Sequence, residues 1–233
     1  MTRIKKIIEQ NREVYDIIAP LFASTRQYIW DDLRPFERYI KPNLKILDLG
    51  CGTGRLYQIF AKFQDSIDYV GLDQSEGQLA EAKKDFPNNK YVQAEMTKLP
   101  FDDASFDLVF CVATLHHLPD EETRHQSLSE MYRILKPAGK VLLTNWNLYS
   151  DSAQKTVEKG KWEENDGEFV VPWMNPKGEV LGERYYYGFT PEYLKKICVE
   201  AGFEVEENYY SKKGKMSDVK KGNNVVTILR KNI

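Results

Sequence analysis

Two acidic residues near a glycine-rich turn have the spacing that most suggests a ligand-binding site in this chain. One comes just before the turn and the other ends the next apolar run. Apolar residues over 45–49 lead into three glycines at alternate positions over 50–54, and a helical pattern follows. Such a turn brings backbone N–H groups and a helix N-terminus close to a ligand. Asp48, just before the glycines, would repel a pyrophosphate but suits a ligand with ammonium and sulfonium groups. Asp73 ends a second apolar run and is placed to accept hydrogen bonds from both hydroxyls of a ribose.

These features resemble the S-adenosylmethionine (SAM) site of class I methyltransferases, and a Rossmann dehydrogenase is the structural rival. Asp48 is the main argument against the dehydrogenase, because that fold holds a pyrophosphate at the same turn. Within the resemblance, Glu95 accepts from the exocyclic amine of adenine, where aspartate is more common, and an apolar neighbour stacks on the ring. The resemblance implies these SAM-binding residues: Tyr15, Arg26, Trp30, Asp48, Gly50, Cys51, Gly52, Asp73, Gln74, Glu95, Met96 and Cys111.

Apolar runs alternate with helical patterns along most of the chain, which predicts a doubly wound α/β fold. Strands are expected over about 45–49, 67–73, 90–94, 107–113, 139–145, 203–210 and 224–230. Helices are expected over about 2–18, 26–40, 54–63, 75–85 and 122–135, and after Thr190; Ser75, Asp120 and Thr190 are expected N-caps. This order implies a Rossmann-like, mostly parallel seven-stranded sheet with an antiparallel last strand and helices on both faces.

Two segments stand apart from this alternation. Residues 1–42 are predicted to form an N-terminal helical lid, with two helices joined at Pro20, and residues 43–233 a SAM-binding methyltransferase domain. Within that domain, a polar stretch at about 147–188 interrupts the rhythm of strands and helices. We expect a structureless insertion that covers the substrate at the carboxyl ends of the strands, because long loops at that edge are usually functional lids.

Composition narrows the class of protein. The chain has 233 residues, a formal net charge of −2 and a pI near 6.0, so it lacks the overall basic character of many nucleic-acid binders. No apolar run is long enough for a membrane span, and the N-terminus lacks the apolar stretch of a signal peptide. Three widely spaced cysteines without a CxxC motif predict a reduced, cytoplasmic protein. No third ligand accompanies the histidine pair at 116–117 at a metal-binding spacing, so no metal is expected.

Further motifs narrow the resemblance. These are Tyr15-Asp-x-Ile-Ala-x-x-Phe-x-x-Thr-Arg-x-x-x-Trp30, Leu115-His-His-Leu, Arg133-Ile-Leu-Lys-Pro, Val171-Pro-Trp173 and Arg184-Tyr-Tyr-Tyr. Together they resemble the tRNA wobble-uridine carboxymethyl methyltransferases, which esterify the 5-carboxymethyl group of uridine at the first anticodon position. Tyr187 departs from the family pattern, which tends to have histidine there, and the insertion is short and acidic. The resemblance implies tRNA as substrate and allows a small zinc-binding activator subunit as partner.

Esterification of a carboxylate needs no general base, because the nucleophile is already an anion at neutral pH. The enzyme must hold one carboxylate oxygen while the other attacks, which suits the fork of an arginine. The resemblance implies Arg26, His117 and Arg184 as catalytic residues, with Arg26 on the carboxylate of either the substrate or SAM. It implies these substrate-binding residues, whose aromatic members would stack on a flipped uridine: Trp30, His116, His117, Trp173, Arg184 and Tyr186.

Two other classes of function fit parts of the sequence. A small-molecule O- or C-methyltransferase of the quinone-biosynthesis type has a similar Tyr-Asp-x-x-Ala segment to that at 15–19 and suits the low positive charge, but the motifs at 25–30 and 184–186 oppose it. A SAM-binding regulator without activity is the third class, and the intact cofactor motifs give no reason to prefer it. Five lysines over 212–221 are either a contact for the RNA backbone or an ordinary solvated loop.

Overall fold

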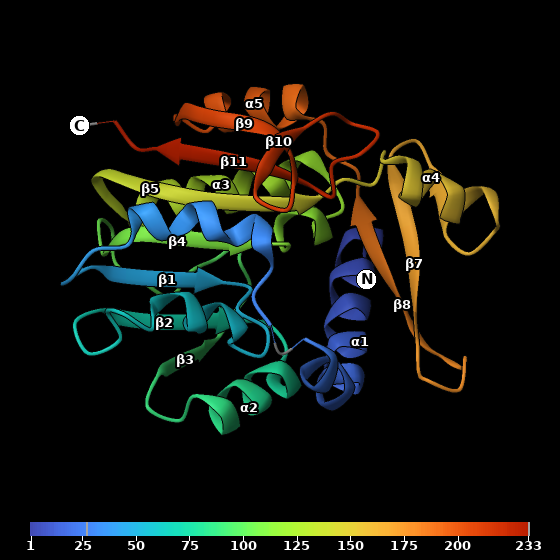
Figure 1. The fold of residues 1–233 in the computed structure, drawn as a ribbon, viewed down its shortest axis with the longest axis horizontal. Helices are drawn as coiled ribbons and strands as arrows, with labels where there is room; N and C mark the ends of the chain where they lie inside the picture. The colour runs from blue at the N-terminus through green and yellow to red at the C-terminus, as the bar shows by residue number, and fades with distance from the viewer. Residues whose placement is uncertain (27, 233) are drawn as a thin grey trace.

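The computed structural model describes residues 1–26 and 28–232, which form a large mixed sheet, a small antiparallel sheet and the helices around them (Figure 1). The large sheet contains β1 (Lys45–Leu49), β2 (Asp68–Asp73), β3 (Lys90–Gln93), β4 (Phe106–Val112), β5 (Leu135–Trp146), β9 (Glu204–Lys212), β10 (Lys215–Ser217) and β11 (Asn224–Arg230). The small sheet contains β6 (Glu163–Asn165), β7 (Glu168–Met174) and β8 (Val180–Tyr187). The α-helices are α1 (Arg3–Thr25), α2 (Glu76–Asp85), α3 (Glu121–Ile134), α4 (Asp151–Glu158) and α5 (Pro191–Glu200), and the 3₁₀ helices are η1 (Asp31–Tyr39), η2 (Arg55–Phe60) and η3 (Leu115–His117). None of the described helices is both long and apolar enough to cross a bilayer.

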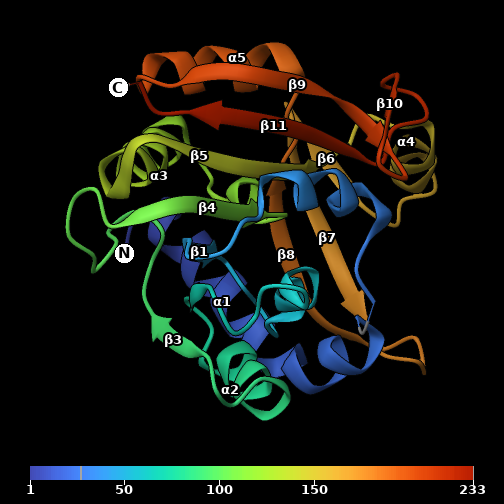
Figure 2. The same ribbon diagram turned by 60° about the vertical axis from the view of Figure 1, so that its left-hand side comes forward.

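The large sheet has the strand order β10-β9-β11-β5-β4-β1-β2-β3 (Figure 2). Strands β1 to β5 pair in parallel, whereas β11 is antiparallel to both β5 and β9. The predicted parallel sheet with an antiparallel last strand is therefore confirmed, and β10 adds a three-residue edge strand that was not predicted. The chain order reverses between β1 and β4, and in such sheets a ligand crevice forms at this point.

Each face of the large sheet builds its own core. In β1, Leu47 and Leu49 join a cluster that includes Leu128 of α3. The alternate residue Ile46 faces the other way, into a cluster with Phe36 of η1. Because both faces are packed, the carboxyl ends of the parallel strands are held together along one edge.

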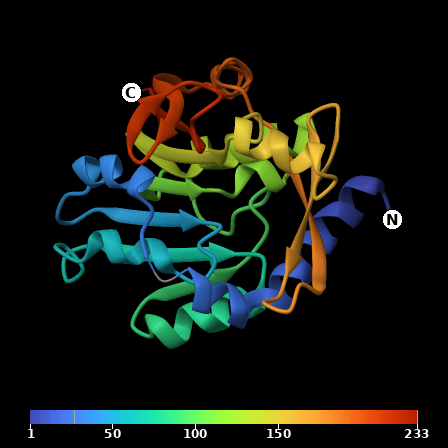
Figure 3. The same cartoon turned by 45° about the vertical axis from the view of Figure 1, so that its right-hand side comes forward.

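Helix α1 and the strand pair β7–β8 stand across this edge (Figures 1 and 3). The predicted break at Pro20 is wrong, because α1 continues through Pro20 to Thr25. A proline in a helix leaves the carbonyl four residues earlier without its donor, which here is the carbonyl of Asp16. Gly77 lies against this carbonyl, so closely that a Cβ there would be 2.9 Å from the oxygen. Helix α1 therefore packs closely on the start of α2 at the turn that precedes the proline.

The helices predicted over 26–40 and 54–63 are replaced by the shorter 3₁₀ helices η1 and η2. Gln27, inside the first of these ranges, lies outside the described residues. Pro35 within η1 has no N–H to donate, so it interrupts the hydrogen-bond ladder that a regular α-helix over 26–40 would need. Although η2 is short, it packs the fully buried ring of Phe60 against the sheet.

The segment 147–188 is ordered, contrary to the prediction of a structureless insertion. It contains α4 and strands β6 to β8, with a small core that includes Leu148 and Phe169. The buried carboxamide of Asn11 in α1 bonds to the backbone of Tyr185 in β8: its oxygen accepts from the N–H at 2.8 Å and its nitrogen donates to the carbonyl at 3.1 Å. Many polar residues of the segment are exposed, and its small sheet rests on α1.

Three of the helices begin at the predicted N-caps. The side chains of Ser75, Asp120 and Thr190 each accept a hydrogen bond from the backbone N–H three residues later, at the start of α2, α3 and α5. The first of these caps fixes the turn that joins β2 to α2, next to the expected ribose acceptor.

Candidate cofactor and substrate site

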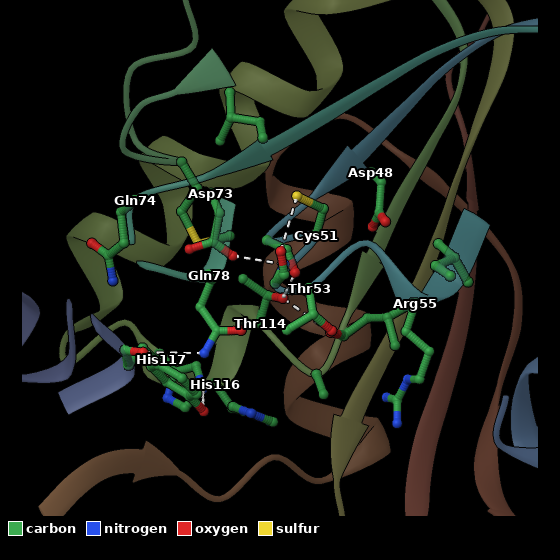
Figure 4. A pocket seen from close by; sticks show the side chains of 18 of the residues that line it. Asp48, Cys51, Thr53, Arg55, Asp73, Gln74, Gln78, Thr114, His116 and His117 are labelled. Atoms are coloured by element: carbon green, nitrogen blue, oxygen red, sulfur yellow. Dashed lines mark hydrogen bonds between the residues drawn. The ribbon is translucent and has the colours of Figure 1, made fainter. Parts of the chain in front are cut away.

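A cavity opens at the carboxyl ends of β1, β2 and β4, under α1 and β8 (Figure 4). It encloses about 1300 Å³, its open mouth included. Its wall comes from the glycine turn after β1, the turn after β2, the residues that follow β3 and β4, and side chains of α1 and β8. The cavity thus lies where the strand order reverses, the place where open α/β sheets bind ligands.

The glycine turn is packed tightly between β2 and the loop after β4. Gly50 has φ +75°, a conformation that favours glycine. A Cβ at Gly50 would overlap the side chain of Thr114 in that loop. The N–H groups of Gly50 and Cys51 donate to the carbonyl of Leu72 at 2.7 and 2.9 Å. The turn is therefore fixed from behind, with its free side toward the cavity.

Asp73, at the end of β2, is oriented by two backbone donors. The N–H of Gly52 donates to Oδ2 and that of Ser75 to Oδ1, both at 2.9 Å. Burial raises the pKa of the carboxyl, while these two hydrogen bonds act in the opposite direction. A carboxylate has about four acceptor positions, so each oxygen keeps capacity for a ligand hydroxyl.

Asp48 is a buried acid in the cavity wall, with 1% of its surface exposed. It accepts a hydrogen bond of 2.8 Å from the hydroxyl of Tyr69. The pKa of Asp48 is raised to about 7, chiefly by burial; the hydrogen bond from Tyr69 and the charge of Arg55 act to lower it, and the charge of Asp73 acts to raise it. A cationic ligand group would favour the ionised form and offset its lost hydration.

The polar groups of the cavity fit the predicted SAM. Asp73 offers acceptors for ribose hydroxyls, and Asp48 offers a negative charge for the cationic part. Oε1 of Gln78 is buried and receives no hydrogen bond from any residue described in the structure. A Cβ at Gly52 would lie 3.5 Å from this oxygen, so a free acceptor adjoins the glycine turn, where it suits an ammonium group.

Three arginines line the same cavity: Arg26, Arg55 and Arg184. Arg184 in β8 is only 3% exposed, and no carboxylate in the described part of the chain pairs with it. Its Nε is buried without a hydrogen-bond partner, and Nη1 donates to the Tyr15 hydroxyl at 3.4 Å. Because an unpaired buried charge is costly, this guanidinium indicates a ligand with an anionic group.

Trp173 lies behind the arginines rather than in the cavity wall. Its ring centroid is 5.5 Å from Cζ of Arg26 and 5.0 Å from Cζ of Arg184. The ring also packs on Phe22, with centroids 5.4 Å apart. Trp173 therefore does not line the cavity as the prediction of direct substrate stacking required; it supports the two guanidinium groups by cation–π contacts.

Arg55 was not predicted from the sequence. Its guanidinium lies over the ring of Trp30, with Cζ 4.4 Å from the centroid. Burial lowers its pKa to about 10; repulsion by Arg26 adds to this, and Asp48 opposes it. Its place directly after the glycine turn, at the start of a helix, is the signal that could have indicated it.

Both ring nitrogens of His117 are already used within the protein. Nδ1 lies 2.9 Å from the carbonyl of Tyr185, which can only accept, so Nδ1 carries the proton. Nε2 then accepts from the hydroxyl of Tyr15 at 3.0 Å. Burial lowers the pKa to about 3, so the ring is neutral. His117 has no free donor for a substrate, contrary to the catalytic and substrate-binding roles predicted for it, and it positions Tyr15 instead.

His116 has the opposite arrangement. The backbone N–H of Trp146 donates to its Nδ1 at 3.2 Å, so the neutral ring carries its proton on Nε2. Burial, with smaller effects from His117 and Arg184, lowers the pKa well below its usual value. Nε2 is buried without a partner among the described residues, and the side chain lines the cavity. His116 therefore offers one free N–H donor to a ligand.

Most of the predicted site residues meet in this cavity: Tyr15, Arg26, Trp30, Asp48, Gly50, Cys51, Gly52, Asp73, Gln74, Glu95, Met96, His116, His117, Arg184 and Tyr186. Cys111 does not, because successive residues of β4 point to opposite faces: Val112 lines the cavity and Cys111 is buried in the core. Gln78 and Trp146 line the cavity without having been predicted. The ring of Trp146 stacks on that of Tyr186, with centroids 5.0 Å apart.

Comparison with known proteins gives a consistent picture. The model of a methyltransferase domain family matches residues 47–143. A protein of Encephalitozoon cuniculi named as a methyltransferase is 33% identical over 82% of this chain and 85% of its own length. A tRNA (carboxymethyluridine(34)-5-O)-methyltransferase of Arabidopsis thaliana is 31% identical over 70% of this chain, which spans only 38% of that relative. A protein of the same name from Schizosaccharomyces pombe is 25% identical over 88% of this chain and 92% of its own length.

Solved structures share the fold. A SAM-dependent methyltransferase of Methanosarcina mazei superposes with a TM-score of 0.68 at 20% identity, over 85% of this chain and 97% of that protein. A chain from the complex between the Haloferax volcanii Trm112 methyltransferase activator and a methyltransferase superposes with a TM-score of 0.66 at 17% identity, over 94% of this chain and 98% of its own. At these identities the likeness is one of fold.

Proposed function

Because this chain belongs to the family of class I SAM-dependent methyltransferases, we propose that its methyl acceptor is the carboxylate of 5-carboxymethyluridine at the wobble position of tRNA. The chain is a SAM-dependent methyltransferase, and the proposal concerns the acceptor. The product would be a methyl ester. The names of the Arabidopsis and Schizosaccharomyces relatives state this position and this nucleoside, which supports the proposal.

The observation that carries the proposal is the buried, unpaired guanidinium of Arg184 in the cavity wall. A carboxylate would satisfy its free Nε–H and compensate its charge. The free Nε2–H of His116 lies in the same cavity and adds a neutral donor. A neutral hydroxyl or an amine as acceptor would leave the charge of Arg184 uncompensated.

The cavity residues can promote the reaction by binding and orientation. SAM, when bound, would supply the methyl group: the acceptor carboxylate oxygen would form its bond to that carbon as the carbon–sulfur bond breaks, so no proton needs to move. Arg184 and His116 would hold the carboxylate, so that one oxygen remains free to attack. Asp73 would hold the ribose and Asp48 would favour the cationic part. Helix α1 and strand β8 cover the cavity and would limit the access of water.

The aromatic rings beside Arg184 suit an unpaired pyrimidine. Tyr186 and Trp146 line the cavity and lie nearly parallel, at 18°. A base in an anticodon loop is unpaired and can be splayed out to stack on such rings. The uracil would pack on this pair while its 5-substituent reaches the guanidinium.

The division into an N-terminal lid, residues 1–42, and a SAM-binding domain, residues 43–233, is part of the proposal. Several residues of the first segment, Tyr15, Arg26 and Trp30 among them, line the cavity together with residues of the second. This supports a role for the first segment in covering the ligands.

A direct assay tests the acceptor. The protein is incubated with methyl-labelled SAM and with tRNA that carries 5-carboxymethyluridine, or with the same tRNA unmodified. We expect label only on the modified tRNA, in a nucleoside that mass spectrometry identifies as the methyl ester and that mild alkali hydrolyses. Equal labelling of the two tRNAs would reject the carboxylate as acceptor.

A small-molecule O- or C-methyltransferase, of the quinone-biosynthesis type, is the second candidate. The net charge of −2 favours it, and a small aromatic acid would also compensate Arg184. The same assay with aromatic acids and quinone precursors separates the two. Activity confined to the small molecules would replace tRNA as the substrate.

We further propose a small zinc-binding activator subunit as partner and the cytoplasm as location. The Trm112 complex among the structures of the same fold supports the partner. The three cysteines, Cys51, Cys111 and Cys198, are buried free thiols, which suits a reducing compartment. Restoration of activity by a co-purified activator subunit, in an otherwise inert preparation, would support the partner; full activity of the chain alone would show that none is needed.

A further inference from the structure

A second hollow opens beside the cavity, on the side of the hairpin formed by β9 and β10. It encloses about 850 Å³, its open mouth included. Trp30 and Trp146 line both this hollow and the cavity, so the two spaces adjoin. Lys213, Asn223 and the exposed Asp31 also line it.

The hairpin is fixed against the segment that leads into η1. The carboxylate of Asp32, 5% exposed, accepts hydrogen bonds of 2.6 to 2.7 Å from the Ser211 hydroxyl, the Gly214 N–H and the Asn224 carboxamide. The approach at Gly214 is so close that a Cβ there would lie 2.7 Å from the carbonyl oxygen of Asp31. Lys213 is therefore anchored at the edge of the hollow.

The segment from the end of β9 through the loop after β10 carries concentrated positive charge in a chain whose net charge is −2. Residues 212–221 contain five lysines and one acid, Asp218. The lysines are all exposed, and within the described part of the chain none has a carboxylate within 4.0 Å: Lys212, Lys213, Lys215, Lys220 and Lys221. A phosphate backbone is the ligand that such a group fits, because counterion release drives the binding.

We propose that this hollow binds the nucleotide next to the target nucleotide, with its base against Trp30 and its phosphate toward Lys213. The inference rests on the proposed function, since it assumes an RNA substrate. An indole ring stacks on any base, and Asn223 and Asp31 can form hydrogen bonds with base edges. The carboxylate of Asp31 repels a phosphate, which leaves the side of Lys213 for the backbone. The target and its neighbour would then lie on either side of Trp30.

Charge reversal at Lys213 tests the inference. The variant is Lys213→Glu, and its matched control is Lys195→Glu, an exposed lysine of α5 that has no ion pair among the described residues. Fluorescence anisotropy measures the binding of a labelled, unmodified anticodon stem–loop RNA at several salt concentrations. We expect the Kd of Lys213→Glu to rise about tenfold, with a salt slope smaller by about one, and the control to match the wild type. Lys215→Glu repeats the test on the same hairpin if Lys213→Glu melts at a lower temperature.

Free 5-carboxymethyluridine provides the second comparison, because it has no neighbouring nucleotide. Lys213→Glu should keep the wild-type KM for this nucleoside and the wild-type affinity for SAM, while its KM for tRNA rises. Equal RNA affinity in Lys213→Glu and Lys195→Glu at low salt would overturn the inference, as would equal losses on nucleoside and tRNA. Failure of the proposed function has a different signature: the wild type would methylate neither acceptor, and the RNA-binding comparison would still decide what the hollow binds.

Discussion

The carboxylate of Asp16 in α1 accepts a hydrogen bond of 2.6 Å from the hydroxyl of Ser75, at the turn between β2 and α2. The same oxygen accepts from the N–H of Gly77 at 2.9 Å. Ser75 in turn caps α2, and its own N–H donates to Asp73. One acid of the N-terminal helix is thus two hydrogen bonds away from the carboxylate that we expect to hold the ribose of SAM.

Replacement of this acid, Asp16→Ala, should therefore reduce both stability and cofactor affinity. Two hydrogen bonds to a charged group are lost and the N–H of Gly77 is left without its acceptor, which should lower the free energy of unfolding by about 1–3 kcal/mol. Thermal melting and calorimetry with SAM measure the two effects. Asp65→Ala, at an exposed position, is the control and should change neither. Normal SAM affinity in a destabilised Asp16→Ala protein would show that α1 does not orient the Asp73 turn.

The raised pKa of Asp48 predicts pH effects on stability and on SAM affinity. In the folded chain this pKa is about 7, above the ordinary 3.8. The folded state therefore binds the proton of Asp48 more tightly than the unfolded state does. The stability that this gives is complete below about pH 4 and is lost as the pH rises through 7. Asp48→Asn cannot ionise. As the pH rises from 5 to 8, the melting temperature of the ligand-free wild type should therefore fall relative to that of the ligand-free variant.

SAM affinity should change in the opposite direction, because a cationic ligand favours ionised Asp48. Calorimetry on the wild type should show tighter binding at pH 8 than at pH 5.5, and Asp48→Asn should bind weakly at both. A wild-type affinity that does not depend on pH would mean that Asp48 stays protonated under the ligand.

Arg26 and Arg184 should differ in what their loss removes. Arg184→Lys keeps a charge but not the fork, so we expect kcat/KM for the carboxylate acceptor to fall about 10- to 100-fold with unchanged SAM affinity. Arg26→Ala should abolish turnover with a normal melting temperature, and calorimetry then decides whether Arg26 holds the carboxylate of SAM or that of the substrate. Loss of SAM affinity in Arg184→Lys would move Arg184 from the substrate to the cofactor.

The two histidines should also be distinguishable. Nitrogen NMR should show both rings neutral at pH 6, with the proton on Nε2 of His116 and on Nδ1 of His117. His116→Gln keeps a donor near the position of Nε2 and should retain most activity, whereas His116→Leu should lose about tenfold or more. Activity should not follow a group that titrates near pH 6.5. A drop in kcat on protonation of a histidine, absent in His116→Gln, would instead indicate a general base.

The central strands of the large sheet could be predicted, because parallel strands that are buried on both faces read as apolar runs; the short edge strand β10 could not. The cap residues Ser75, Asp120 and Thr190 could be predicted because a cap is a local interaction. Strands β6 to β8 could not, since their order depends on contacts with α1 such as that between Asn11 and Tyr185, which are 174 residues apart. Local patterns contain no information about such a partner.

The site residues also divide into those that could be predicted from the sequence and those that could not. The positions of Asp48 and Asp73 follow from motif spacing, but the side of β4 that faces the cavity does not: Cys111 was predicted, whereas its neighbour Val112 lines the cavity. The different roles of the two histidines depend on backbone groups of Trp146 and Tyr185, which only the folded chain brings to the rings.

The overlap between a Cβ at position 50 and the side chain of Thr114 has an evolutionary consequence. The two residues follow different strands, yet a side chain at position 50 needs a smaller residue at position 114. Gly50→Ala in the present background would displace the loop that carries both histidines. Thr114→Gly would remove the overlapping atoms, but the left-handed backbone at position 50 would still disfavour alanine. Position 50 is therefore restricted to glycine both by its neighbour and by its own backbone, so an evolving lineage cannot free it by a change at residue 114 alone.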